Sequence, residues 1–215
     1  MRSFKEYHEF IERCRQTLSL VRESPIQIHS PFDWLEDSKR NKGIYNICQQ
    51  ANPIQLETNL YVSSTQLGTI FYSLSQSQQD PIDFLLVLNL ININPLGIVP
   101  VQTSIWKRAG YNFSARRIFW QYAIKLKELI VSDNKQTRNG KDFWLRRLNE
   151  AASNGYKCYA IDTIEGVIYS LGSTPANEAL KYYTNDAIEG ASDEEINKVS
   201  NGLRYRICIS KDDLQ

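Results

Sequence analysis

The sequence has few of the residues that build metal and disulfide sites. Its 215 residues include two histidines and four cysteines. The cysteines are widely separated, with no C-x-x-C spacing, which argues against a disulfide framework and against a zinc site. We therefore predict no metal site and expect reduced core cysteines in a cytoplasmic protein. These cysteines are Cys14, Cys48, Cys158 and Cys208.

Long apolar runs and an excess of one charge sign are also absent. No apolar stretch approaches the ~20 residues that a membrane-spanning helix needs. The first residues, MRSFKEYHEF, carry charges where a secretory signal peptide is apolar. Lysine and arginine number 25 against 24 aspartate and glutamate, a formal net charge of +1. This balance predicts no membrane partner and no general attraction to nucleic acid.

The first half of the chain changes from a helical to a strand pattern. Residues 4–23 have one apolar stripe at helical spacing, and a second helical piece is expected over 32–50, interrupted near Gly43. Three apolar runs follow, LETNLYVSS, GTIFYSLS and DFLLVLNLI, separated by polar clusters with Gln, Ser, Asp and Pro. Short runs spaced in this way predict an antiparallel meander.

Residues 99–162 alternate strand and helix patterns. The order is VPVQTSIWKR, SARRIFWQYAIK, ELIVSD, DFWLRRLNEAASNG and YKCYAID. Two short crossovers of this kind place helix N-termini at the carboxyl edge of a sheet, where free N–H groups favour anions. A turn at 163–166 then leads to VIYSLG, and RYRICIS alternates as a late strand.

These patterns predict three parts. Residues 1–52 form a helical N-terminal extension, residues 53–170 form an α+β or α/β core, and residues 171–215 form a helix-strand addition packed on that core. A helix cap is expected near Ser192, and GSTPANEA near 172–179 has a linker composition too short to mark a domain boundary.

Two motifs carry a family resemblance. The loop R-A-G-Y-N-F-S-A follows the expected central strand, in the place of a Q/R-x-x-G-x-G/A pyrophosphate loop. The segment SDNKQTRNGKDFW matches the spacing S-D-x-x-Q-T-x-x-G-x-x-x-W of GNAT-like proteins of bacteriophages. On these residues the sequence resembles the GNAT superfamily of acyl-CoA-dependent N-acyltransferases. The resemblance implies a mixed, mostly antiparallel central sheet with helices on both faces.

The same resemblance implies a reaction and a set of site residues. Acetyl-CoA would supply an acetyl group to a primary amine of a small molecule or a protein, in the host cytoplasm if the chain is phage-encoded. The acyl-CoA loop would consist of Arg108, Gly110, Asn112, Ser114, Ala115 and Arg116.

Three residues are candidates for the chemistry itself. Asp133 would act as a general base or amine anchor, and Tyr156 or Tyr159 would protonate the departing thiolate. Glu57 or an ordered water is an alternative base. The structural alternatives are that Asp133 caps a helix and that both tyrosines pack in the core.

Two other functions compete with acyl transfer. Bulky residues at 111–113 stand where the loop needs small ones, which favours a GNAT-like scaffold without cofactor that binds and inhibits a host defence protein. A cluster of cations suggests nucleic-acid binding, against the alternative of a solvated helix face. These cations are Lys107, Arg108, Arg116, Arg117, Arg138, Lys141, Arg146 and Arg147.

Overall fold

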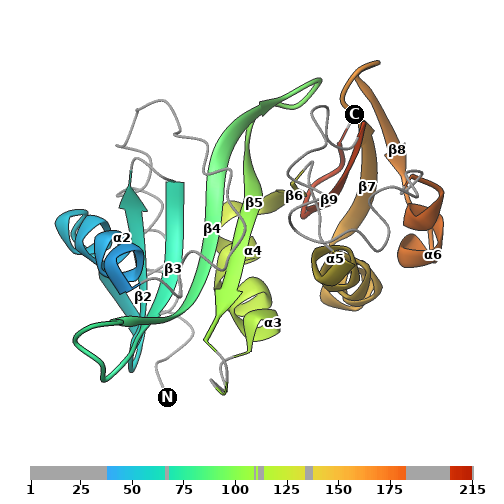
Figure 1. Ribbon diagram of the computed structural model, residues 1–215. Helices are drawn as coiled ribbons and strands as arrows, with labels where there is room; N and C mark the ends of the chain where they lie inside the picture. Colours follow the sequence, from blue (N-terminus) through green and yellow to red (C-terminus); the bar gives the residue numbers. More distant parts are fainter. Residues whose placement is uncertain are drawn as a thin grey trace. The chain divides into compact units, whose positions relative to one another are not determined.

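The computed structural model describes residues 38–65, 68–108, 110, 114–133, 138–182 and 204–214 (Figure 1). The fold is α+β, with a mixed sheet whose hydrogen-bonded strand order is β1-β2-β3-β4-β5-β6-β9-β7-β8. The predicted mixed sheet is confirmed at this level. The helices predicted over 4–23 and near Ser192 lie outside the described residues.

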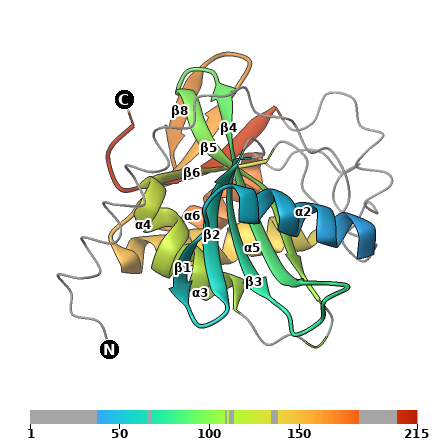
Figure 2. The same cartoon turned by 90° about the vertical axis from the view of Figure 1, so that its left-hand side faces the viewer.

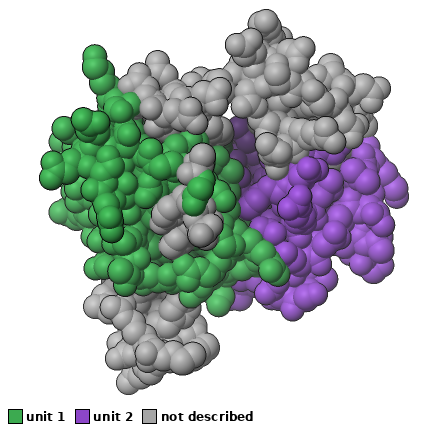
Figure 3. Space-filling model, turned by 60° about the horizontal axis from the view of Figure 1, so that its bottom comes forward, with its two compact units in different colours: residues 1–28, 32–89, 103–127 green, residues 29–31, 90–102, 128–215 purple. Residues whose placement is uncertain are grey.

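The chain divides into two compact units, coloured separately in Figure 3. Unit 1 takes residues 1–28, 32–89 and 103–127, and unit 2 takes 29–31, 90–102 and 128–215. Strands β4 and β5 each contribute residues to both units. The division between the units falls after Asn89 within β4 and after Gln102 within β5.

Unit 1 is built around the predicted antiparallel meander, which is confirmed. Strands β1 to β4 pair in chain order, each antiparallel to the next. Helix α2 lies across this sheet in Figure 2, where Ile44 and Cys48 join a core cluster that also contains Ile70, Tyr72 and Val87. The elements are α2 Ser38–Gln50, β1 Ile54–Glu57, β2 Leu60–Thr65, β3 Gly68–Leu74 and β4 Ile82–Ile93.

Helix α2 runs unbroken through Gly43, so the predicted interruption at this residue is wrong. Glycine in a helix interior costs about 1 kcal/mol relative to alanine, which the packing of Ile44 and Cys48 against the sheet outweighs. No proline stands inside the helix to remove a backbone donor.

The predicted strand-helix-strand segment is confirmed. After β5 (Gly97–Lys107), Ser114 caps a helical stretch made of α3 (Ala115–Ile118), the π-helical turn η2 (Phe119–Ala123) and α4 (Ile124–Lys127). Strand β6 (Leu129–Ser132) then pairs parallel to β5, with Val101 beside Val131 and Gln102 beside Ser132.

In unit 2 the last strand of the chain lies between two earlier strands, a position that the sequence pattern does not predict. The last strand pairs antiparallel with both β6 and β7, so it lies inside the sheet. The linker-like stretch near 172–179 contains a short helix. The elements are α5 Arg138–Ala151, η3 Ala152–Asn154, β7 Lys157–Asp162, β8 Val167–Ser170, α6 Pro175–Ala179, η4 Leu180–Tyr182 and β9 Tyr205–Ser210.

The core of unit 2 joins strands that are far apart in the sheet order. Ile93 and Val99, beside the β4–β5 turn, share one hydrophobic cluster with Ile161 of β7 and Cys208 of β9. The cysteines Cys48, Cys158 and Cys208 are buried and free, as the sequence predicts, and Cys14 lies outside the described residues.

Candidate functional site

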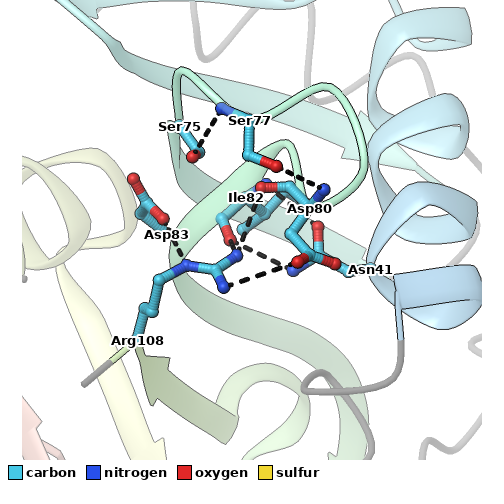
Figure 4. Close-up of polar contacts among 7 residues, drawn as sticks. All are labelled: Asn41, Ser75, Ser77, Asp80, Ile82, Asp83 and Arg108. Atoms are coloured by element: carbon cyan, nitrogen blue, oxygen red, sulfur yellow. Dashed lines mark hydrogen bonds and ion pairs between the residues drawn. The ribbon is translucent and has the colours of Figure 1, made fainter.

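Arg108, the first residue of the predicted acyl-CoA loop, is engaged by the start of β4 (Figure 4). Its Nε donates to Asp83 Oδ1 at 2.6 Å, and its Nη2 donates to the carbonyls of Asp80 at 3.2 Å and Ile82 at 3.1 Å. Its backbone N–H donates to Asp83 O at 2.9 Å. The guanidinium therefore holds the β3–β4 connection in place, and a phosphate would have to compete with a carboxylate and two carbonyls.

Asn41 of helix α2 hydrogen-bonds to the backbone of the same strand. Its Oδ1 accepts from Ile82 N at 2.9 Å and its Nδ2 donates to Ile82 O at 3.1 Å, with the side chain fully buried. Figure 4 shows Asn41 and Arg108 approaching the Ile82 backbone from α2 and from the end of β5. This network is structural, because the Arg108 guanidinium and the Asn41 amide both bond the backbone of β4 and its connection, and Arg108 also pairs with Asp83.

The rest of the predicted loop lies at the start of the helical stretch. Gly110 has φ of 77°, the left-handed region that glycine adopts without strain, and a Cβ placed there would meet no atom within 4 Å. Ser114 caps α3 by accepting from Arg117 N at 3.3 Å. Ala115 is half-buried and Arg116 is exposed, while Asn112 lies outside the described residues.

The Glu57 carboxylate accepts three hydrogen bonds from this helical stretch. Arg117 reaches it with both terminal nitrogens, Nη1 to Oε1 at 3.1 Å and Nη2 to Oε2 at 2.7 Å. The hydroxyl of Tyr122 donates to Oε1, and Gln121 Nε2 donates to that hydroxyl oxygen at 3.2 Å. Tyr122 is buried and the Glu57 side chain is 26% exposed, so a carboxylate with an ordered hydrogen-bond set faces solvent on one side.

Two irregular backbone features meet at this carboxylate. Glu57 follows a register shift between β1 and β2, and Tyr122 lies in the π-helical turn η2. Bulges in strands and π turns in helices both re-aim side chains and are enriched at functional sites. We therefore count Glu57 and Tyr122 with the candidate site.

In unit 2, Asp133 follows the end of β6 and is half-buried. Its charge acts on Arg206 of β9, whose pKa is lowered by burial and raised in smaller part by Asp133. Arg206 Nη1 donates to Ser132 O at 3.4 Å, and its Nε, also buried, has no hydrogen-bond partner. Asp133 and the Arg206 guanidinium therefore lie close enough for their charges to interact.

The two candidate tyrosines differ in their surroundings. Tyr159 is buried; its hydroxyl donates to Asp213 Oδ1 at 3.2 Å and accepts from Leu214 N at 3.2 Å. Burial raises the pKa of Tyr159, and burial likewise raises the pKa of Tyr156. Both phenols therefore keep their protons at neutral pH, and Tyr156 is half-buried where Tyr159 is enclosed.

The described cofactor residues belong to unit 1, whereas Asp133, Tyr156 and Tyr159 belong to unit 2. Sequence reasoning named Glu57 as one alternative base but missed Tyr122, and it missed Arg206 as the neighbour of Asp133. No local signal marks either pairing, because each joins residues more than sixty positions apart in the sequence.

The described part of the chain contains neither a candidate metal-binding group nor a helix that could span a membrane. Its His, Cys, Asp and Glu residues form no group of three or more that could hold a metal ion. None of its helices is long and apolar enough to cross a membrane. Comparisons with protein-family models, with curated proteins and with solved structures found no match.

Proposed function

We propose that the chain is a GNAT-like N-acetyltransferase that moves an acetyl group from acetyl-CoA to a primary amine. The observation that carries the proposal is the parallel pairing of β5 with β6, with a glycine-bearing loop and a Ser114-capped helical stretch between them. The loop follows the carboxyl end of β5, and α/β proteins bind their ligands at the carboxyl ends of parallel strands.

The reaction needs four events that this chain's residues would assist. The lone pair of a neutral amine attacks the thioester carbonyl carbon, and a strand N–H would polarise the carbonyl oxygen. The C–S bond then breaks, the amine proton passes to a carboxylate, and the CoA thiolate takes a proton from an acid. Asp133 or Glu57 would accept the first proton, and Tyr156 or Tyr159 would supply the second.

The loop fits a phosphate in part. The open space beside Gly110 leaves room for a ligand to approach the backbone, and Arg116 supplies an exposed cation just beyond. Arg108 contributes less, since its guanidinium already bonds Asp83 and two carbonyls. Arg116, beside the Ser114 cap at the start of the helical stretch, is the residue whose substitution tests the cationic contact.

The direct test is acetyl-CoA binding by isothermal titration calorimetry at low salt. We expect micromolar binding by the full chain and at least about tenfold weaker binding by Arg116→Ala, the loss of one charge-assisted contact. Lys125→Ala is the matched control, because Lys125 is an exposed cation on the same helical stretch and should leave affinity unchanged. Absence of binding by the wild-type chain would refute the acyl-CoA proposal.

The identity of the base is tested by comparing Glu57→Gln with Asp133→Asn. Each substitution removes the carboxylate and keeps the size of the side chain. The variant that lacks the base should have a kcat about 100-fold or more below that of the wild type, with little change in KM. Its pH profile should also lack the acidic limb. If both variants keep the activity of the wild type, neither carboxylate is the base, and proton removal is assigned to water.

A second candidate function is favoured by the position of Arg108. Because Asp83 and two carbonyls occupy its guanidinium, the loop lacks one of its expected cations. We infer, as the alternative, a GNAT-like protein that binds and inhibits a host defence protein without using acetyl-CoA. Capture of one host protein by the tagged chain, with no acetyl-CoA bound in calorimetry, would support this alternative; acyl transfer without a captured partner would exclude it.

A further inference from the structure

A buried cation of unit 2 lacks an anionic partner in the described part of the chain. Arg206 of β9 is 9% exposed, and its guanidinium makes one hydrogen bond to the described residues, from Nη1 to Ser132 O at 3.4 Å. Its Nε is buried without a hydrogen-bond partner, and no described residue forms an ion pair with it. A buried charge is costly unless it is paired, and a guanidinium has several N–H donors to satisfy. The edge formed by Nε and Nη2 therefore has unused capacity to bind an anion.

The strand register places Arg206 on an apolar face of the sheet. Arg206 is opposite Ile161 of β7, and Cys208 is opposite Tyr159. These three neighbours belong to one hydrophobic cluster, and residues that lie opposite each other share a face. Such neighbours offer the guanidinium few acceptors, and the low local dielectric strengthens any charge interaction that it makes. Burial lowers the pKa of Arg206, the direction expected for a cation without a close anion.

One carboxylate lies across the strand pair from this cation. Strands β6 and β9 are side by side in Figure 1, with Val131 opposite Cys208. The same register, carried two residues further, sets Asp133 opposite Arg206, and the charge of Asp133 acts on the guanidinium. Side chains opposed in this way have Cβ atoms ~5 Å apart, so one small molecule can touch both. Asp133 is half-buried, so this end of the strand pair reaches solvent beside its carboxylate.

The two opposite charges favour a ligand that carries both signs. The Asp133 carboxylate would repel a lone anion bound to Arg206, and the Arg206 guanidinium would repel a lone amine bound beside Asp133. A molecule with neighbouring carboxylate and ammonium groups avoids both repulsions. The planar Nε–Nη2 edge also matches the two oxygens of a carboxylate in bidentate geometry. Amino acids have this combination of groups.

We propose that Arg206 and Asp133 bind an amino acid, with its carboxylate on the Nε–Nη2 edge of Arg206 and its amino group beside Asp133. The binding itself does not require acetyl-CoA. That the bound amino acid is the acyl acceptor rests on the proposed acyl transfer. In that reaction Asp133, a candidate base, would stand next to the amino group whose proton it accepts.

Calorimetric titration of the full chain, in the absence of acetyl-CoA, tests this site. The probes are the standard L-amino acids, each compared with its α-carboxamide, which keeps the amino group and the side chain but lacks the carboxylate charge. We expect at least one amino acid to bind with millimolar or tighter affinity. Its carboxamide should bind at least about tenfold more weakly, because a charge-assisted bidentate contact is lost.

Two variants assign the contact to Arg206. Arg206→Met removes the cation and should bind the amino acid and the carboxamide equally weakly. Arg206→Lys keeps the charge without the planar edge and should lose most of the tenfold discrimination. Arg146→Gln is the matched control, because Arg146 is an exposed arginine of the same unit, and it should keep the wild-type ratio of affinities. Circular dichroism melts establish that each variant is folded, and the ratio measured on the wild type is decisive even if one is not.

Three results would overturn the inference. The first is that no amino acid binds, in which case water satisfies the buried Nε. The second is that carboxamides bind as tightly as their amino acids. The third is that inorganic phosphate binds as tightly as any amino acid and is lost in Arg206→Met, which would assign a plain anion site.

The same titrations separate this inference from the acyl-transfer proposal. Acetyl-CoA binding without amino-acid binding removes the inference and leaves acyl transfer to another amine. Amino-acid binding with the expected discrimination, but without acetyl-CoA binding, confirms the Arg206 site and refutes the acyl-CoA proposal.

Discussion

Asp162 and Arg204 form an ion pair that closes the end of β7, with 2.5 Å between Arg204 Nη2 and Asp162 Oδ2. The Asp162 side chain is 1% exposed and that of Arg204 is 45% exposed, so the cation covers the carboxylate from the solvent side. The same carboxylate accepts the two N–H groups that shape the β7–β8 turn. One residue thus links the ion pair to the turn that presents Ile164.

The stability of the protein should depend on Asp162 in a defined pH window. The hydrogen bonds from Arg204, and in smaller part those from the turn, lower the pKa of Asp162 to about 2. Because the folded pKa is below the unfolded value of about 4, this carboxylate stabilises the fold above about pH 4. The contribution is lost as the pH falls from about 4 through about 2.

Denaturant unfolding of Asp162→Asn against wild type, repeated from neutral to acidic pH, measures this contribution. We expect the variant to be less stable by a clear margin at neutral pH and the difference to shrink below about pH 4. Glu165→Gln is the control, because Glu165 is exposed and lies 3.6 Å from Arg204. A pH-independent difference between Asp162→Asn and wild type would contradict the assigned role.

Arg108→Gln should destabilise unit 1 by about 1–3 kcal/mol, because it removes a charge-assisted bond to Asp83 and two bonds to carbonyls. Lys107→Gln, one residue earlier and exposed, should change the free energy of unfolding by less than about 0.5 kcal/mol. A double-mutant cycle with Asp83→Asn measures the coupling directly. Additive effects of the two substitutions would show that the pair is not coupled.

Asn41→Ala should cost about 1–3 kcal/mol of unfolding free energy. The substitution leaves the N–H of Ile82 without its side-chain partner in a buried place, whereas Ile82 O keeps the bond from Arg108, and a buried unpaired polar group carries the full desolvation cost. Asn46→Ala, on the exposed side of the same helix, is the matched control. A loss no larger than that of the control would mean that other groups satisfy Ile82.

Two glycine-to-alanine substitutions should have opposite signs. At Gly68 the backbone has φ of 108° and a Cβ would stand 2.4 Å from Leu88 O, so alanine should destabilise by about 2 kcal/mol or more. At Gly43, inside α2, a Cβ meets no atom within 4 Å, and alanine should stabilise by roughly 0.5–1 kcal/mol. Thermal unfolding of both variants and of the wild type measures the sign of each change in stability.

The sequence predicts most strands and the α5 helix well because their signals are local. The apolar runs around Phe71, Leu86 and Ile130 are short and bounded by polar clusters, and each becomes a strand. The place of β9 between β6 and β7 is different. Its partners lie more than forty positions earlier in the chain, and alternation alone does not say which strand a strand will pair with.

The candidate site is predictable only in part for the same reason. Ser114 stands before a helical pattern and caps α3, a place in which serine is favoured. The bond between Tyr122 and Glu57 depends on a π turn that rotates Tyr122 toward β1, and that turn has no simple residue pattern. The structural use of Arg108 was missed because Asp83 lies on the preceding strand, not beside the loop.

The insertion of β9 sets an order of assembly during synthesis. Strand β6 hydrogen-bonds to β5 and β9, and β7 to β8 and β9, so among the described strands the two halves of this sheet are joined through Tyr205–Ser210. The strands of unit 1 are all translated by Lys107, whereas the sheet of unit 2 stays in two pieces until β9 has left the ribosome. Until then β6 and β7 present open strand edges, which makes this interval the one in which a nascent chain is most exposed to mispairing.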